Sequence, residues 1–245
     1  MTWRRTSSTA TRLGRQLRHD PRSVALMLVV PCVLMTLLRY VFDAQPPVFD
    51  RIGPMLLVIF PFTVMFVISS VAMLRERTSG TLERLLAGPI DRAELVVGYG
   101  LAFGAAAVVQ VGLVSALSFG LLGLDVEGSV VLLLAVAVLV ALLGLALGLL
   151  VSAFARSEFQ AVQFLPAIVL PQFLLCGLFV PRDEMATALD WASRALPLTY
   201  AVDAASRAAS ESGIGASLAV DLVVVMAAVP AALFLGAATL RRRTA

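Results

Sequence analysis

Long apolar runs alternate with short polar segments along this chain. Six runs have the roughly 20 residues that a helix needs to cross the hydrocarbon core of a bilayer; they cover about residues 23–42, 53–74, 95–122, 129–154, 159–180 and 216–240. None shows the short apolar–polar alternation of a membrane β-strand. Helices are the other structure that can span a membrane. The pattern therefore predicts an all-α integral membrane protein with six transmembrane helices, formed by a single domain over residues 1–245.

The composition supports a membrane protein. The chain has 245 residues, of which 60% are hydrophobic and 14% are charged, whereas a soluble domain carries roughly 25% charged residues. Cys32 and Cys176 both lie inside apolar runs, where they are expected to pack rather than to form a disulfide. The first apolar run is too long for a signal peptide, and no A-x-A cleavage pattern follows it.

The distribution of arginine predicts the orientation. All 19 Lys/Arg positions are arginine. Fourteen of them lie before the first run, after the second, after the fourth or after the sixth, whereas the opposite side carries only Arg51, Arg182, Arg194 and Arg207. Cytoplasmic segments carry the Lys/Arg excess. We therefore expect a multi-pass protein of a bacterial plasma membrane with both termini in the cytoplasm.

Residues 1–22 are basic and amphipathic. Ala10, Leu13 and Leu17 recur at helical spacing, with arginines elsewhere around the helix. This pattern is typical of a short helix on the membrane surface, with Trp3 as an interfacial anchor; a disordered basic tail is the alternative. Asp20 followed by Pro21 predicts the helix start of the first span.

The predicted spans contain few ionisable side chains. Arg39 and Asp221 lie near the outer ends of spans one and six, where they can reach the outer interface or belong to an outer gate. Polar side chains without charge are expected to bond between helices or to line a pore; they are Gln110, Gln163 and Gln172. The sequence has no phosphate-binding loop, cofactor motif or catalytic triad. Energy for any uphill movement would therefore come from another chain.

Two further patterns concern helix packing. The Gly100/Gly104 and Gly144/Gly148 pairs leave small-residue ridges on spans three and four, and such ridges permit close helix contact. Pro166 and Pro171 fall within span five. Because each proline removes a backbone donor, they should kink or weaken that span.

The polar segment between spans two and three, residues 75–94, predicts a short helix. Gly80 can act as its N-cap, and Glu83 is placed to reach back to the free backbone donors. Leu82, Leu85 and Leu86 give one apolar face. A Gly-Pro pair ends it at 88–89, and Asp91 is the expected N-cap of the third span. A helix this short needs a surface to lie on, either lipid headgroups or a groove on a cytosolic protein.

Three separate stretches resemble the type-2 ABC exporter permeases, including daunorubicin-resistance-type drug exporters. RHDPRSVALMLVVP at 18–31 resembles the start of their first span, and FVPRDEMATALDWASRALPLTYAVDAASRA at 179–208 resembles their outer segment before span six. RERTSGTLERLLAGPIDRAELVVGYGLA resembles the segment between their spans two and three. In that last stretch the matching residues are Arg75, Glu76, Arg77, Gly80, Thr81, Leu82, Glu83, Leu85, Leu86, Pro89, Arg92, Glu94 and Leu95.

The resemblance implies that residues 75–94 carry a coupling helix, which sits in a cleft of a separate ATP-binding subunit. The residues expected to couple are Glu76, Arg77, Gly80, Thr81, Leu82, Glu83, Arg84, Leu85 and Leu86. Glu76 and Arg77 would contact the coupling helix or the N-terminal helix. The outer loop, residues 182–215, would supply short helices that dip into the outer leaflet and help to close an exit path, or else rest on the membrane surface. The candidate gate residues are Leu189, Leu196, Pro197, Tyr200 and Asp203.

The resulting expectation is the permease subunit of an ATP-driven exporter for a hydrophobic or amphipathic cargo. It would have no enzyme activity, cofactor or metal of its own, because the partner subunit would bind ATP and Mg²⁺. Its partners would be that cytosolic ATPase, a second permease, membrane lipid and a hydrophobic substrate, with no nucleic acid. An ion-coupled transporter and a membrane scaffold are the alternatives.

Overall fold

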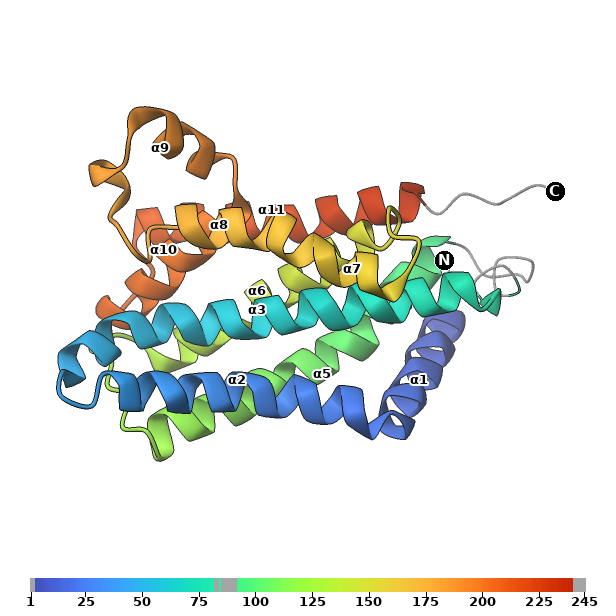
Figure 1. The fold of residues 1–245 in the computed structure, drawn as a ribbon, viewed down its shortest axis with the longest axis horizontal. Coiled ribbons are helices and arrows are strands. Elements are labelled where there is room, and N and C mark those ends of the chain that lie inside the picture. The colour runs from blue at the N-terminus through green and yellow to red at the C-terminus, as the bar shows by residue number, and fades with distance from the viewer. Residues whose placement is uncertain (1–2, 82–83, 85–91, 240–245) are drawn as a thin grey trace.

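The structure is a computed structural model, and it describes residues 3–81, 84 and 92–239. The described residues form helices joined by short turns (Figure 1). The α-helices are α1 (Trp3–His19), α2 (Pro21–Val41), α3 (Pro46–Thr78), α5 (Arg92–Gly120), α6 (Val130–Val151), α7 (Glu158–Phe164), α8 (Leu170–Leu175), α9 (Thr187–Arg194), α10 (Pro197–Ser210) and α11 (Ala216–Thr239). A π-helix, η1 (Leu165–Val169), joins α7 to α8, and a 3-10 helix, η2 (Arg182–Glu184), precedes α9.

Six helical segments are long and apolar enough to cross a membrane, which confirms the prediction. They are α2, α3, α5, α6, the continuous α7–η1–α8 segment and α11. The second span is longer than predicted, because α3 begins at Pro46 rather than near Gly53. Its first turns carry Asp50 and Arg51, and these charges hid the helix from a hydropathy pattern.

The pair α3 and α6 forms the centre of the bundle. A Cβ atom on Gly144 would collide with the backbone of Phe62, and one on Gly148 would collide with the backbone of Phe66. The small-residue ridge on span four therefore lets the two helices touch, as predicted. Ser69 of α3 adds a hydrogen bond from its hydroxyl to the carbonyl of Leu145, at 3.1 Å.

Only one of the two glycines in the ridge predicted on span three makes a close contact with another helix. Gly104 packs against Leu142 of α6, whereas a Cβ on Gly100 would meet nothing within 4 Å. Gln110 makes the expected bond between helices, because its Nε2 donates to the carbonyl of Met27 in α2 at 2.9 Å. Gln172 instead donates within its own segment, to the carbonyl of Ile168.

Helix α1 packs onto the protein instead of lying on lipid alone. Its Thr6, Thr9 and Leu13 are buried, and a Cβ on Gly98 of α5 would touch Thr9 at 2.8 Å. The segment is helical, as the amphipathic pattern indicated. Figure 1 shows α1 crossing the end of the bundle, between the start of α2 and the end of α3.

Span five is broken where the two prolines lie. The π-helix η1 contains Pro166, and α8 begins directly before Pro171. A proline lacks the N–H of a normal helical bond, and a π-helical turn is one way to accommodate the missing donor. The helix ends at Leu175, five residues earlier than predicted, and Gly177 follows with a φ of 91°.

The bundle has two different ends (Figure 1). One carries α1, the end of α3 and the end of α11; the other carries α9 and the end of α10. Residues 182–215 contain short helices, as expected, but α10 is not a surface helix. It buries Leu198, Ala201, Ala204, Ala205 and Ala208 against the spans.

Candidate functional site: the charged end of α3 and the outer ion pairs

The last two turns of α3 carry Arg75, Glu76 and Arg77 in succession. Consecutive helical residues point about 100° apart, so these three side chains leave the helix in three directions. Each meets a different part of the bundle, described in turn below. The end of α3 therefore acts as a junction, which we call the α3 hub and define as these three residues with their printed partners.

Glu76 holds the buried contact of the hub. Arg12 of α1 donates to its two carboxylate oxygens, from Nη1 at 2.9 Å and from Nη2 at 3.2 Å. The Glu76 side chain is 4% exposed and that of Arg12 is 35% exposed. Burial by itself lowers the pKa of Arg12, and the bonds with Glu76 outweigh it and raise the pKa. A two-pronged pair of this kind fixes orientation as well as distance.

Arg75 holds the exposed contact of the hub. Its Nε and Nη2 donate to the carboxylate of Glu158, at 2.7 and 3.1 Å, at the start of α7. Its Nη1 lies 3.5 Å from Asp20, which caps α2 by accepting bonds from the backbone N–H and hydroxyl of Ser23. These Ser23 bonds lower the pKa of Asp20. One guanidinium therefore links the starts of α2 and α7 to the end of α3.

Arg77 holds the third contact, because its Nη1 donates to the carbonyl of Ser152 at the C-cap of α6. The last carbonyls of a helix lack partners within the helix and carry partial negative charge, so a cation is well placed there. We expected Glu76 and Arg77 to contact the coupling helix or the N-terminal helix. Glu76 does contact the N-terminal helix, and Arg77 also contacts α6.

The predicted coupling helix begins next to the hub. Gly80 has a φ of 70°, in the left-handed region that favours glycine, and it directly follows Ser79, the C-cap of α3. It therefore ends α3, and it also holds the expected N-cap position directly before Thr81, although its φ is not the extended one typical of an N-cap. Its carbonyl also accepts a bond from the N–H of Arg84 at 3.2 Å. Thr81 is helical. The remaining coupling candidates, Leu82, Glu83, Leu85 and Leu86, lie outside the described residues, as does Asp91.

Sequence reasoning missed how α1 is fixed. Gly98 provides the close approach to Thr9, and the buried ring of Tyr99 stacks on that of Phe103, with centroids 5.9 Å apart. Nothing in the Gly-Tyr-Gly stretch at 98–100 marks it in the sequence as a contact for α1. The buried face of α1 could have pointed to a glycine on a neighbouring helix, but an amphipathic pattern does not indicate which helix.

Two ion pairs tie the segments at the other end of the bundle. Arg182 of η2 lies 2.5 Å from Asp203 of α10, and Arg207 of α10 lies 3.0 Å from Asp221 of α11. Burial raises the pKa of Asp203, which the positive charge of Arg182 opposes. Asp221 was expected either to reach the outer interface or to belong to a gate. Its side chain is 8% exposed and pairs inside the protein.

Arg39 lies in the last turn of α2 and contacts neighbouring segments. Its Nε donates to the carbonyl of Leu122 at 3.1 Å, and its Nη1 donates to Asp43 at 3.2 Å. The guanidinium also lies over the ring of Phe49, 5.8 Å from its centroid. Arg39 thus connects α2 to the α5–α6 turn and to the start of α3.

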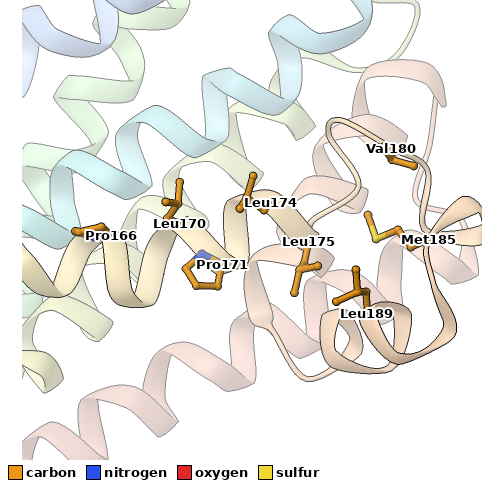
Figure 2. A pocket seen from close by; sticks show the side chains of 8 residues that line it. All are labelled: Pro166, Leu170, Pro171, Leu174, Leu175, Val180, Met185 and Leu189. Atoms are coloured by element: carbon orange, nitrogen blue, oxygen red, sulfur yellow. The ribbon is translucent and has the colours of Figure 1, made fainter.

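The candidate gate residues lie in two settings. Leu196 is the N-cap of α10 and Pro197 its first residue, while Tyr200 donates to the carbonyl of Arg194 at 2.9 Å. Leu189 instead lines a pocket of about 600 Å³ (Figure 2). The pocket is apolar, and Figure 2 shows Leu189 and Met185 opposite Leu175 of α8. The loop after span five thus folds back over the broken span.

This arrangement offers contacts for holding and moving helices. Among the described residues, no group of three or more His, Cys, Asp or Glu could hold a metal ion. Four ion pairs instead connect different elements at the two ends. The fold and these sites define a multi-pass, all-α membrane protein whose ion pairs between elements lie at the two ends of its spans.

The comparison with known families gives the identification. The model of the ABC-2 type transporter family matches residues 6–208, which is most of the chain. The chain therefore belongs to the ABC-2 type transporter family, as the resemblance of its three stretches indicated. Within that family it corresponds to the membrane-spanning permease.

Individual relatives agree with this assignment. The probable multidrug ABC transporter permease YbhS of Escherichia coli is 28% identical over 178 residues, 72% of this chain and 47% of the relative. The inner membrane transport permease YhhJ of E. coli is 30% identical over 140 residues, 57% of this chain and 37% of the relative. ABC transporter G family member 20 of Dictyostelium discoideum is 26% identical over 155 residues, 63% of this chain and 21% of the relative. The chain spans less than half the length of each of these relatives.

Proposed function

We propose that this chain is the permease subunit of an ATP-driven exporter and that residues 75–94 receive movement from a cytosolic ATPase. The observation that carries the proposal is the α3 hub. A segment that follows directly on Gly80 is joined through α3 to α1, α2, α6 and α7 by three consecutive side chains. A push on that segment would therefore reach most of the bundle as a rigid-body movement. The proposal includes the orientation with both termini in the cytoplasm.

A second copy of the permease is part of the proposal. The α7–η1–α8 segment exposes Phe159, Gln163, Leu170 and Leu174. A polar amide such as Gln163 is costly against lipid hydrocarbon, so this face suits a partner permease or a cargo path. A homodimer or a heterodimer with a similar permease would enclose that path. The cargo would be hydrophobic or amphipathic, such as a drug, an antibiotic, a lipid or a glycolipid, since the outer pocket is lined by apolar side chains.

The test uses the chain in its own membranes. When the wild-type permease is captured, a protein with a phosphate-binding loop should copurify with it, together with ATP hydrolysis. Leu85→Asp should abolish this copurification, because a carboxylate would enter an apolar cleft. Ser79→Asp, placed before the predicted helix on an exposed residue, is the control and should retain both. Both variants should insert into the membrane normally. ATP hydrolysis that copurifies equally with Leu85→Asp would contradict the coupling assignment.

The same preparation separates the alternatives. Export that continues after ATP depletion but stops when the proton gradient is collapsed would favour an ion-coupled transporter. The ion pairs that the described residues form between elements, Arg12–Glu76, Arg75–Glu158, Arg182–Asp203 and Arg207–Asp221, lie at the ends of the spans, which does not favour an ion relay through the bundle. A scaffold would show neither ATP hydrolysis nor export.

A further inference from the structure

A second pocket lies at the end of the bundle that carries α1. It has a volume of about 240 Å³ and is enclosed by α1, α2, α3 and α5. Its walls differ from those of the pocket beside α8, because they carry charged and polar side chains as well as apolar ones. One part of the wall contains Gln16, Asp20, Ser23 and Arg75. These residues come from the end of α1, the start of α2 and the end of α3.

The remaining wall is apolar except for Tyr99. Leu26 of α2, Val71 of α3 and Phe103 of α5 are among the residues that line it. Leu26 is 61% exposed on the outside of the bundle, so the pocket adjoins the surface that faces lipid. A pocket of this volume would hold about eight waters at about 30 Å³ each. Most of them would touch apolar walls without finding the two to four polar partners that a buried water needs.

The polar part carries both signs of charge. Asp20 and the Nη1 of Arg75 are 3.5 Å apart, and both side chains remain partly exposed, at 37% and 51%. Asp20 is ionised at neutral pH because the Ser23 bonds lower its pKa. The two other nitrogens of the guanidinium bond Glu158, which leaves Nη1 directed to the pocket side where Asp20 lies. A ligand with a phosphate and an ammonium group would match this pair.

We propose that this pocket binds one phospholipid with a zwitterionic headgroup from the adjoining leaflet, as a bound lipid of the permease. An acyl chain would lie against Leu26, Val71 and Phe103. The phosphate would meet Arg75 and the amine would meet Asp20. The depth is suitable, because α2 begins at Pro21, and a span of its length places its first residues at headgroup level. The inference requires only that the helices span a bilayer and does not depend on the proposed export.

Such a lipid would have a structural consequence. It would contact α1, α2, α3 and α5 together, next to the side chains that connect α1 and α2 to the α3 hub. The lipid would thus fill the space between these helices where protein side chains leave a cavity, and it would stabilise the position of α1.

The experiment measures lipid bound to the purified full chain. Protein is stripped of lipid in mild detergent, titrated with phosphatidylethanolamine, and examined by native mass spectrometry. Ala72 lines the pocket, so Ala72→Phe should fill it and weaken the first lipid adduct by about tenfold, the effect of losing contact with about two methylenes. Ala105→Phe, on the exposed face of α5, is the matched control and should bind like the wild type.

A second arm tests the headgroup. The wild type should bind phosphatidylethanolamine more tightly than phosphatidylglycerol, which lacks the amine. Asp20→Asn should remove that preference, and it keeps a residue that caps helices well, so this variant remains informative even if Ala72→Phe does not fold. Equal adducts in wild type and Ala72→Phe, or equal losses in the two Phe variants, would overturn the site. Equal binding of the two lipids by the wild type would overturn the headgroup assignment.

Discussion

At the scale of single residues, burial separates the charge pairs of this protein into two kinds. The Arg12–Glu76 pair has one side chain 4% exposed, whereas in the Arg194–Asp190 pair the side chains are 55% and 21% exposed. Removing one partner of a buried pair leaves an uncompensated charge, while a surface pair of the i,i+4 type contributes only about 0.3–0.5 kcal/mol. The first pair should therefore stabilise the position of α1, and the second should matter little.

A double-mutant cycle can compare them. Arg12→Gln and Glu76→Gln, singly and together, should give a coupling energy of about 1–3 kcal/mol, measured by thermal unfolding of the purified protein in detergent. The same cycle on Arg194 and Asp190 serves as the control and should stay below about 0.5 kcal/mol. Equal coupling in the two cycles would contradict the distinction by burial.

Two glycines of α5 offer a second test at this scale. A Cβ on Gly98 would press on Thr9 of α1, whereas a Cβ on Gly100 would meet nothing within 4 Å. Gly98→Val should therefore displace α1, and trypsin should then cut at Arg15 or Arg18 faster than in the wild type. Gly100→Val should leave the cleavage rate unchanged; if it accelerates cleavage equally, the effect belongs to helix propensity and not to docking.

Single residues are also where the sequence was least informative. Gly80 was expected as an N-cap, and its carbonyl does accept a bond from the N–H of Arg84, but its positive φ also ends α3. The sequence does not show that α3 continues to Thr78. Asp221 was expected near the outer interface or in a gate; the structure pairs it with Arg207, fourteen positions away on α10. Whether a charged residue reaches solvent or a partner depends on how the helices pack, which a one-dimensional pattern does not contain.

At the scale of elements, apolar run lengths were enough to predict the spans. The starts of α2 and α11 lie within two residues of their predicted positions. Predicted boundaries differ from the observed ones where a charged residue or a proline interrupts the apolar run but the helix continues, as at Asp50 in α3. The partner of α1 could not be predicted, because an amphipathic face looks the same whether it covers lipid or another helix.

The broken span gives the prediction at this scale. Pro171→Ala would restore a backbone donor next to η1 (Leu165–Val169). A straighter α-helix should result, and the amides of residues 165–175 should exchange hydrogen about tenfold more slowly, which corresponds to roughly 1.4 kcal/mol of added local stability. Pro54→Ala, within the well-packed α3, is the control for removing a proline from a span. Unchanged exchange in both variants would show that the break does not depend on Pro171.

At the scale of the whole molecule, six spans place the turn before α7 and the turn before α11 at opposite ends of the bundle. The excess of arginine at the α1 end predicts that this end is cytoplasmic. The turn before α7 should then face the cytoplasm, and the turn before α11 should face the opposite side.

Thiol labelling tests that prediction directly. In a background with Cys32→Ala and Cys176→Ala, Arg156→Cys and Ser212→Cys introduce single exposed thiols before α7 and before α11. A membrane-impermeant maleimide should label Ser212→Cys in intact cells and Arg156→Cys only after the membrane is opened. The reverse result would invert the orientation, and labelling of both in intact cells would contradict the span count between them.

The three directions taken by Arg75, Glu76 and Arg77 restrict how α3 can move. With 33 residues, α3 is a rod of about 50 Å. Turning this rod about its own axis would pull all three side chains away from α7, α1 and α6 at the same time, whereas tilting it together with those helices would keep every contact. The contacts of the hub thus oppose rotation of α3 about its axis but allow α3 to tilt. Any working stroke of this protein should be a swing of a connected block, with the deformation taken up at breaks such as η1 and not by twisting of α3.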